Sequence, residues 1–598
     1  MTLRVRAKSF VEAGVLGPLE VHVVERLAAA VGLVDDDVQL GLAFAVRAPR
    51  VGHVGVDLGT VAVDSELPLA WPADRAAWHA RTAACALVGE DRPFVHVGGL
   101  VVTRRYHAYQ ARIASAFVAR AKTTMVPDAA ALHKQLDQLF GPPRGGEPDL
   151  QRLAALVAVL RPLTVISGGP GTGKTYTVKK LLALLESRHF AETGQQPRVA
   201  LAAPTGKAAA RMKQAIGEGL EKLKPPRVRA FLRQQTPVTL HRLLGWDPRN
   251  PTRFRHDAAH PLPHEIVVVD EASMIDLAML AKLVDAVRPD ARLILLGDRH
   301  QLASVEAGSA LADLVSGTGP RGMRLPTELA ARIREIDDMF AVIGLEDATA
   351  PPFAGGLVQL SRPYRFGAST GVGQLAHAIG RGDTTEALRL LHDPAIADVS
   401  LGRADEALIG AALRAGYRPF LEAATRGAEP RVVLDAFERF RVLSAHRKGR
   451  RGVEGLRELA GRVLYDEFPE ARGTRPVLIT ENAPEVGRWN GDIGVVLGER
   501  AYFLGGEEVE RLEASRLPPH EAPFAMTVHK AQGSQVDDVV LVLPERPSSI
   551  LTRELIYTAI TRARVSVRIL GDEAVLRAAL SRTIERASAL PALLWGET

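Results

Sequence analysis

Cysteine is almost absent from the sequence, and this absence restricts the chemistry that the chain can carry. Cys85 is the only cysteine among 598 residues. A single thiol excludes both a disulfide within the chain and a metal cage built from thiolates. Its apolar neighbours in AACALV are typical of a small core residue rather than a nucleophile. The scarcity of cysteine fits a reducing compartment, and we therefore expect a cytoplasmic protein.

Long apolar runs and a strong charge imbalance are missing as well. No segment approaches about 18 consecutive apolar residues, and the N-terminal MTLRVRAKSF lacks the apolar core of a signal peptide, so no membrane contact is expected. Lys and Arg total 75 against 69 Asp and Glu, and the resulting net charge of +6 permits a polyanionic partner without requiring one. The basic clusters at residues 222–235 and 446–452 fit a solvated face as well as a nucleic-acid contact.

The length of the chain indicates several domains. At roughly 150 residues per domain, 598 residues correspond to about four structural units. Helical periodicity predicts a mainly helical N-terminal domain over residues 1–120, with short extended pieces near residues 52–58 and 94–102. Such a domain is more typical of an interaction module than of an active site. Residues 121–148 end in the cluster GPPRGGEP, which predicts a linker.

One stretch carries a specific signature of nucleotide binding. Residues 163–177 read LTVISGGPGTGKTYT, in which G-x-x-x-x-G-K-[ST] lies between an apolar strand pattern and a helical pattern. Glycines let successive backbone N–H groups turn toward phosphates, and the helix N-terminus adds its dipole. Lys174 is expected to reach the outer phosphates, and Thr175 to offer its hydroxyl to Mg²⁺. The predicted nucleotide-binding residues of this loop are Gly168, Gly169, Pro170, Gly171, Thr172, Gly173, Lys174 and Thr175.

Apolar strand patterns after this loop predict an α/β doubly wound core. They lie at residues 198–203, 265–270 and 292–297, and the ligands of such a sheet lie at the carboxyl ends of its strands. An acidic residue at the end of a buried strand is costly unless a cation compensates it. Asp270 is therefore the expected Mg²⁺ ligand, and Glu271 is the candidate that orients or activates the attacking water.

Two glutamines near this core are further candidates. Gln301 follows the strand pattern at residues 292–297 and is expected to sense the γ-phosphate, although an ordinary capping turn at Asp298 also explains that stretch. Gln151 lies one helix before the glycine-rich loop, where its amide would read the adenine edge by donating and accepting hydrogen bonds.

The C-terminal part of the sequence predicts a second α/β unit without a phosphate loop of its own. Residues 490–519 alternate strand patterns with glycine turns, which predicts a small antiparallel β insertion within this unit. The strand patterns assigned to the second α/β unit are GLVQL (356–360), FRVLSA (440–445), RPVLIT (475–480), DVVLVL (538–543) and VSVRIL (565–570).

Nine segments in order along the chain resemble the motifs of superfamily 1 helicases, and most closely those of the RecD family, the subunits of RecBCD enzymes (exodeoxyribonuclease V). The segments are SGGPGTGKT, APTGKAAARM, TLHRLLG, VVVDEASM, LGDRHQLASVEAG, LSRPYRF, WNGDIG, AMTVHKAQGSQ and LIYTAITRAR. The resemblance implies an α/β fold with two RecA-like P-loop NTPase domains at residues 149–356 and 357–598. It also implies a small β (SH3-like) insertion at about residues 490–522.

Individual residues take on roles from this resemblance. It implies that Tyr364 stacks on the adenine, that Arg365 contacts the γ-phosphate and that Arg562 is a second arginine finger. Pro363 departs from the family pattern without displacing the Tyr-Arg pair. For a lone histidine a packed core position is the usual alternative, and the flanking motifs favour DNA contact here. The residues implied to line a DNA strand are Thr205, Lys207 and His241 in the first domain and Thr527, His529 and Lys530 in the second.

The resemblance also implies a function. It predicts an ATP-dependent 5′-to-3′ DNA helicase subunit of a RecBCD-type helicase/nuclease that processes double-strand DNA breaks for recombinational repair, using ATP and Mg²⁺. Single-stranded and double-stranded DNA ends, together with RecB-like and RecC-like subunits of a heterotrimer, are the expected partners. Docking is expected through the N-terminal domain, and the nuclease activity in a partner. The alternatives are a free-standing RecD-like helicase, whose helix-hairpin-helix extension we do not find, and a regulatory subunit with an ATP switch.

Overall fold

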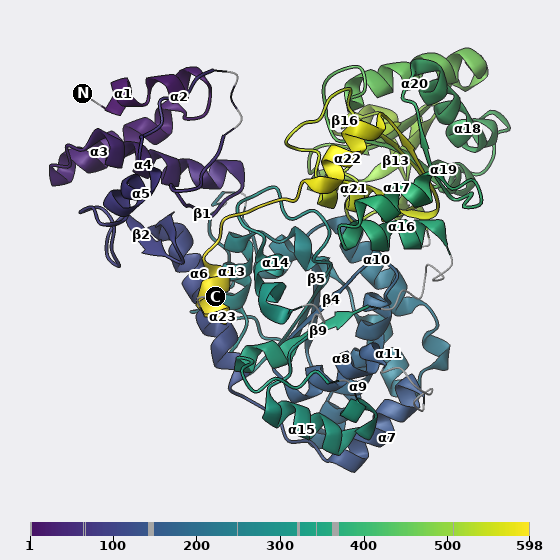
Figure 1. Cartoon of the computed structure of the whole chain (residues 1–598). Helices are drawn as coiled ribbons and strands as arrows, with labels where there is room; N and C mark the ends of the chain where they lie inside the picture. The colour runs from purple at the N-terminus through teal and green to yellow at the C-terminus, as the bar shows by residue number, and fades with distance from the viewer. Residues whose placement is uncertain are drawn as a thin grey trace.

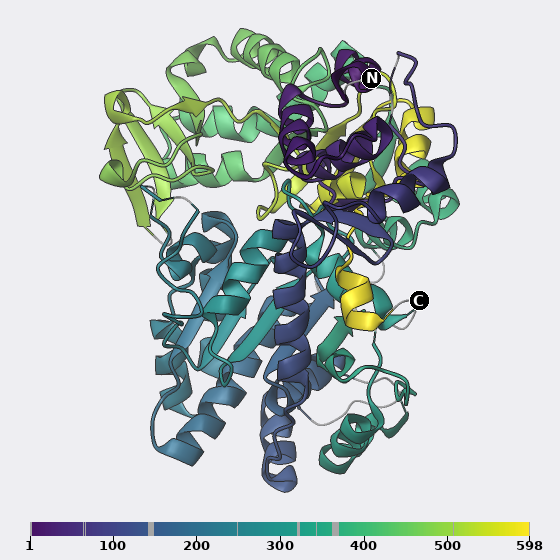
Figure 2. The ribbon, with the colours of Figure 1, turned by 90° about the vertical axis from the view of Figure 1, so that its left-hand side faces the viewer.

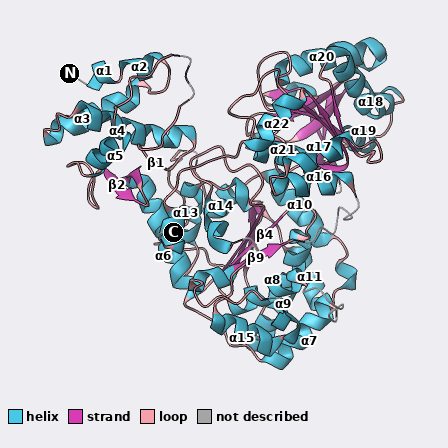
Figure 3. Cartoon of the chain, in the orientation of Figure 1, coloured by secondary structure: helices cyan, strands magenta, loops and turns pink. Residues whose placement is uncertain are grey.

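Parallel β-sheets covered by helices make up most of the described chain (Figures 1 and 3). The computed structural model describes residues 3–63, 65, 67–141, 149–247, 249–250, 252–319, 323–342, 344–361, 370–505 and 508–596. A smaller N-terminal domain, purple in Figure 1, and an antiparallel sheet accompany the two parallel sheets. No described helix is both long enough and apolar enough to cross a membrane.

The N-terminal domain is mainly helical, as predicted. Its short strands form an antiparallel sheet in the order β1-β3-β2, within the two stretches predicted to be extended. Its core holds Phe10, Phe44 and Trp78, and the Trp78 Nε1–H donates to the carbonyl of Asp37 over 2.6 Å. The elements are α1 Leu3–Arg6, α2 Lys8–Glu12, α3 Pro18–Val31, α4 Asp36–Arg47, β1 Gly55–Val56, α5 Arg75–Ala83, β2 Phe94–Val97 and β3 Leu100–Thr103.

The first large sheet is parallel throughout and has the strand order β6-β5-β7-β8-β4-β9. Neighbouring residues of one strand enter different cores, Val165 on one face and Ile166 on the other, so that both faces are buried. This explains the uninterrupted apolar runs in the sequence. The strands are β4 Leu163–Gly168, β5 Val199–Ala203, β6 Val238–Thr239, β7 Ile266–Val269, β8 Arg292–Gly297 and β9 Leu357–Leu360.

Helices from distant parts of the chain cover the two faces of this sheet. One face carries α7 Ala129–Phe140, α8 Leu150–Leu160, α9 Lys174–Thr193, α10 Gly206–Gly217, α11 Pro226–Gln234 and α15 Thr327–Ile336. The other carries α6 Arg104–Ala121, α12 Leu240–Leu244, α13 Leu277–Ala286, α14 Ala310–Val315 and α23 Leu590–Trp595.

Two predicted boundaries around this domain are wrong. Residues 121–148 are not simply a linker, because they contain α7, whose Leu132 and Leu136 are fully buried in the core. Helix α6, which we assigned to the N-terminal domain, runs along the first large sheet (Figure 2) and its Arg112 pairs with Asp285 of α13 at 3.1 Å. Helical periodicity identifies an apolar face but does not show which sheet that face covers.

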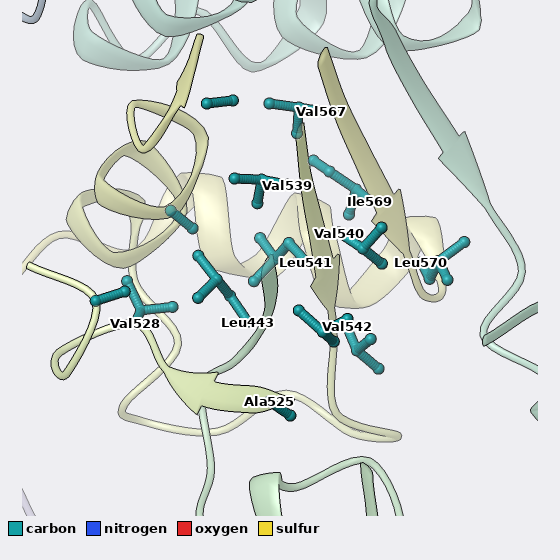
Figure 4. Close-up of a cluster of buried hydrophobic side chains, with 14 of the residues drawn as sticks. Leu443, Ala525, Val528, Val539, Val540, Leu541, Val542, Val567, Ile569 and Leu570 are labelled. Atoms are coloured by element: carbon teal, nitrogen blue, oxygen red, sulfur yellow. The ribbon is translucent and has the colours of Figure 1, made fainter. Parts of the chain in front are cut away.

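The second large sheet is also parallel, in the order β10-β19-β18-β11-β17. Figure 4 shows its apolar side chains, among them Leu443, Val540 and Ile569, gathered from neighbouring strands. The strands are β10 Val399–Gly402, β11 Phe440–Ser444, β17 Ala525–Thr527, β18 Val536–Val542 and β19 Ala563–Leu570. The helices are α16 Gly371–Gly380, α17 Thr384–His392, α18 Glu406–Thr425, α19 Pro430–Glu438, α20 Val453–Glu467, α21 Arg553–Ile560 and α22 Glu573–Ser581. The two parallel domains are the predicted RecA-like pair.

The predicted antiparallel insertion is present, with the strand order β15-β14-β13-β12-β16 and a small core of its own around Val477 and Phe503. Two strand assignments are corrected here. RPVLIT forms β12 of this insertion, and GLVQL contains β9, which pairs with β4 in the first parallel sheet. An apolar run shows that a strand is buried without showing its partner. The insertion's strands are β12 Thr474–Ile479, β13 Ile493–Leu497, β14 Arg500–Gly505, β15 Glu508–Glu513 and β16 His520–Glu521.

The C-terminal end of the chain returns to the first domain. After α22 the chain, yellow in Figure 1, leaves the second domain and places α23 beside α6. The Trp595 ring lies 4.6 Å from the Phe353 ring, centroid to centroid. The expectation that residues 357–598 all belong to the second domain is therefore wrong at both ends.

We predict that replacing Leu136 by Ala lowers the free energy of unfolding of the first domain by about 2–5 kcal/mol, since it removes a buried side chain and leaves a cavity. Urea unfolding of the full chain measures this change. The matched control is Gln138→Ala, on the exposed face of the same helix α7, which should change stability by no more than about 0.5 kcal/mol. Equal effects of the two substitutions would indicate a loosely packed linker instead.

Candidate functional site

The glycine-rich loop joins the end of β4 at Gly168 to the start of α9 at Lys174. Gly171 and Gly173 have φ angles of 75° and 80°, in the region that glycine adopts without steric cost. A Cβ atom on Gly168 would lie 2.6 Å from the Thr172 hydroxyl, so the close turn requires glycine there. The backbone of this loop therefore forms the cradle that the sequence predicts.

Side chains around the loop hold it in shape. The Lys174 ammonium donates to the carbonyls of Gly168 and Gly169, over 2.6 and 3.2 Å. The Gln151 side-chain amide donates to the Thr172 carbonyl over 2.9 Å, so helix α8 is attached directly to the loop. The prediction that Gln151 reads adenine stays a prediction.

Asp270 and Glu271 follow β7 at the same carboxyl edge of the sheet. Asp270 is buried, and burial together with the adjoining Glu271 raises its pKa, against the opposing effect of Lys174. Glu271 has a φ of 54°, the only positive value outside glycine among the described residues. Its Oε2 atom is buried without a hydrogen-bond partner. A strained backbone and an unsatisfied acceptor in one residue are typical of a functional position.

A third strand end carries Asp298 and Gln301. The Gln301 side-chain amide donates to Asp298 Oδ2 over 3.2 Å. The same carboxylate oxygen accepts from the hydroxyl of Tyr557, in α21 of the second domain, over 3.1 Å. Burial and Asp298 raise the pKa of Tyr557 well above its usual value, so this phenol stays protonated and donates. The capping-turn alternative for Asp298 is therefore incomplete, because the carboxylate also connects the two domains.

Further hydrogen bonds cross between the domains beside Asp298. The Leu302 N–H donates to the Thr558 hydroxyl over 2.8 Å, and the Gln532 amide donates to the Leu302 carbonyl over 3.0 Å. Arg211 of α10 donates to the Gly533 carbonyl over 3.0 Å. The segment that follows β8 is thus held by the second domain.

A cleft of about 300 Å³ lies between the two domains. Arg562 is 3% exposed, donates to the carbonyls of Thr558 and Ser534 over 3.1 and 3.3 Å, and lines this cleft together with Lys174. Burial lowers the pKa of Arg562, and Glu271 partly opposes that effect. Other lining residues are Thr175, Lys179, Arg211, Glu218, Asp270, Glu271, Gln301 and Gln535.

The chemistry of this cleft fits a nucleoside triphosphate with Mg²⁺. Cationic side chains and the backbone amides at the N-terminus of α9 suit phosphate oxygens. The Thr175 hydroxyl and the Asp270 carboxylate are oxygen donors of the kind that Mg²⁺ prefers. The unpaired Glu271 oxygen leaves an acceptor for a water molecule. Tyr364 and Arg365, predicted to complete the site, and Pro363 before them lie outside the described residues.

The predicted DNA-contacting residues of the first domain lie in two places. Thr205 and Lys207 lie near the contact between the two domains with parallel sheets, which we call the seam, and His241 lies in an aromatic cluster. The Thr205 hydroxyl caps α10 by accepting from the Ala208 N–H over 3.2 Å. Lys207 is half-buried, and burial lowers its pKa to about 8, against the opposing effect of Glu438 in the second domain. His241 lies beside Trp246 and Phe254, with ring centroids 6.1 and 5.9 Å apart.

The predicted DNA-contacting residues of the second domain lie at the end of β17 and directly after it. The Thr527 hydroxyl accepts from the Lys530 N–H over 3.3 Å, and the Lys530 ammonium pairs with Glu521 at 2.8 Å. His529 is half-buried, and burial lowers its pKa. The DNA roles of these residues stay predictions.

Sequence reasoning missed several residues of the cleft and seam. Arg211, Gln532, Gln535 and Tyr557 all lie within the motif segments quoted above, but nothing assigned them a role. A polar side chain inside each motif was the signal that could have identified them.

Comparisons with known proteins place the chain among helicases. Models described as "AAA domain" and "UvrD-like helicase C-terminal domain" match residues 151–307 and 523–570. The RecBCD enzyme subunit RecD of Mycolicibacterium smegmatis is 40% identical over 596 residues, which cover 97% of each chain. That of Mycobacterium tuberculosis is 40% identical over 98% of this chain and 96% of its own. The ATP-dependent RecD2 DNA helicase of Deinococcus radiodurans is 30% identical over 71% of this chain and 49% of its own.

Among solved structures, a Pif1 helicase from Bacteroides in complex with ADP-AlF3 and ssDNA is 15% identical. The match covers 72% of this chain and 94% of that one, with a TM-score of 0.38. That likeness is too weak to support an inference about the cleft.

We predict that Glu271→Gln makes the chain more stable by on the order of 1 kcal/mol at neutral pH, because it removes the negative charge adjoining the buried Asp270. The measurement is urea unfolding without nucleotide or Mg²⁺. Glu218→Gln is the matched control, since it also lines the cleft but adjoins no carboxylate. A loss of stability in the Glu271 variant would mean that its carboxylate is satisfied in solution.

Proposed function

The chain belongs to the RecD family of RecBCD enzyme subunits, and from that premise we propose that it is an ATP-dependent DNA helicase subunit that acts on double-strand breaks. Full-length relatives of that name support this proposal. The observation that carries it is the shared cleft, which places Lys174 of the first domain and Arg562 of the second around one space. Cations on more than one side of the transferred group stabilise the charge that develops in phosphoryl transfer.

Each residue of the cleft has a proposed role in ATP hydrolysis. Lys174 and the loop amides hold the phosphates, and Thr175 with Asp270 would hold Mg²⁺, which neutralises phosphate charge when bound. Glu271 orients or activates the attacking water, as its unpaired carboxylate oxygen supports. Arg562 stabilises the charge that develops on the transferred group.

The remaining predicted cleft residues complete this proposal. Gln301 senses the γ-phosphate, and its hydrogen bond to Asp298 passes that state to Tyr557 of the second domain. We also propose that Tyr364 stacks on the adenine, with Gln151 reading its edge, and that Arg365 contacts the γ-phosphate.

ATP turnover would move DNA by changing how the two domains meet. Binding across the cleft favours the closed arrangement, and loss of the bridging phosphate releases it. The proposed DNA contacts occur in both domains, so alternating grips would move a single strand in one direction, and we propose that this direction is 5′ to 3′. These contacts are Thr205, Lys207 and His241 in the first domain and Thr527, His529 and Lys530 in the second.

The proposal includes partner subunits of the RecB and RecC type, docked through the N-terminal domain. That domain exposes large apolar side chains, including Leu19 at 70% and Val34 at 86%. Exposed apolar side chains form a protein interface where they lie together in one patch. In this proposal a partner subunit cuts the DNA.

A free-standing helicase is the rival function, and the match to a RecD2 helicase favours it. Native co-purification separates the two functions. The complex-bound subunit should elute with its partners in gel filtration, whereas a monomer that unwinds well and binds neither partner would favour the rival.

Unwinding assays on duplexes with a 5′ or a 3′ overhang test the motor itself. We predict strand displacement from the 5′ overhang, and its loss in Lys174→Gln, because the variant lacks the cation that holds the outer phosphates. Unchanged displacement by Lys174→Gln would leave only a regulatory role for the ATP site.

We predict that Arg562→Ala lowers the rate of ATP turnover by on the order of 10³-fold, as for other arginine fingers, with a much smaller effect on nucleotide affinity. Steady-state turnover and equilibrium binding of a fluorescent nucleotide measure the two effects. Arg564→Ala is the control, because this exposed arginine lies two residues away and outside the cleft lining. Equal losses of turnover and affinity would argue against a finger role.

A further inference from the structure

The segment at residues 582–589, which we call the C-terminal strap, connects the second domain to both other domains. At its start the Arg553 N–H donates to the Arg582 carbonyl over 2.8 Å, and the Ile584 N–H donates to Glu554 over 3.0 Å, which holds it on α21. At its end the Val54 N–H of the N-terminal domain donates to the Ala587 carbonyl over 2.7 Å. Helix α23 then packs into the core of the first domain.

Arg586, in the middle of the strap, forms hydrogen bonds to the loop at residues 302–308 of the first domain. Its guanidinium donates to the carbonyls of Ser304, Glu306 and Gly308, over 2.5, 2.6 and 2.8 Å. Three carbonyls of one short loop around one planar group match the fixed donor geometry of arginine. The loop continues to the N-terminal domain, because the Gly308 N–H donates to the Gly52 carbonyl over 3.0 Å.

The other end of this loop lies at the nucleotide cleft. Gln301 lines the cleft, and the next residue, Leu302, is held by Thr558 and Gln532 of the second domain. Residues 302–308 are therefore fixed at both ends by groups from the C-terminal half of the chain. Burial lowers the pKa of His529, a proposed DNA contact, and the charge of Arg586 adds to that effect.

We propose that Arg586 is a positioning residue that couples DNA binding to ATP turnover by holding the loop at residues 302–308. This role rests on the proposed helicase function. Movement of the second domain reaches the loop twice, through Leu302 beside the cleft and through the strap at Arg586. The loop, which is also bonded to Gly52 of the N-terminal domain, then transmits movement of the second domain and its DNA-contacting residues to Gln301 at the cleft.

Arg582 provides a matched control within the same strap. Its guanidinium donates to the Ser548 carbonyl, inside the second domain and away from the loop. If the strap only stabilises the fold, Arg582→Ala and Arg586→Ala should have similar effects. If the strap couples the two sites through the loop, only Arg586→Ala should lower the coupling.

The experiment measures ATP turnover by the full chain with and without single-stranded oligothymidine, together with the melting temperature. Arg586→Ala should lower the ratio of stimulated to unstimulated turnover at least about fivefold, the low end of ordinary coupling between sites. Arg586→Lys, which keeps the charge and N–H donors, should give an intermediate ratio. Unstimulated turnover and the melting temperature should change no more than in Arg582→Ala.

An unchanged ratio in Arg586→Ala, or an equal fall in Arg582→Ala, would overturn the proposal. If Arg586→Ala does not yield folded protein, Arg586→Lys decides, since a reduced ratio supports the coupling role and a wild-type ratio contradicts it. Absence of any stimulation in the unaltered chain would overturn the helicase function and the coupling role together.

Discussion

The hydrogen bond from the Tyr557 hydroxyl to Asp298 joins the two domains that contain the parallel sheets. Asp298 follows β8, three residues before Gln301, which lines the cleft. Both partners are buried, so an unpaired carboxylate there would be costly. The bond therefore favours the arrangement that brings Arg562 into the same space as Lys174. Because the cleft is shared by two domains, ATP hydrolysis depends on the distance between the domains. The distance in turn depends on which nucleotide the cleft binds. That reciprocity is what a motor requires.

The covering of the first sheet shows how the rest of the chain supports this seam. One face is covered by helices from within the first domain, whereas the other is covered by α12, α13 and α14 together with α6, near the N-terminal domain, and α23, near the C-terminal end. The strap and α6 thus place the N-terminal domain on the same body as the phosphate loop. A partner that binds the N-terminal domain is consequently positioned relative to the ATP site.

The phosphate loop and the acidic strand end were predictable because each depends on a few adjacent residues whose chemistry fixes the local backbone. Pairing between distant segments was not. GLVQL and RPVLIT were correctly read as strands and placed in the wrong sheets, since the apolar pattern of a strand does not identify its neighbour. The role of Arg586 could not be predicted from the sequence, because the carbonyls to which it donates lie about 280 residues earlier in the chain. The segment around Tyr364 and Arg365 lies outside the described residues, so its role rests on family membership.

A distance between the two domains with parallel sheets measures directly whether the cleft between them closes on nucleotide and opens again. Spin labels at Lys213→Cys in α10 and Arg564→Cys in β19, in a Cys85→Ser background, report on the first and second domains. We predict a shorter distance with a non-hydrolysable ATP analogue and Mg²⁺ than with ADP, measured by pulsed electron paramagnetic resonance. The same distance in the nucleotide-free, analogue-bound and ADP-bound states would contradict a motor driven by movement between these domains.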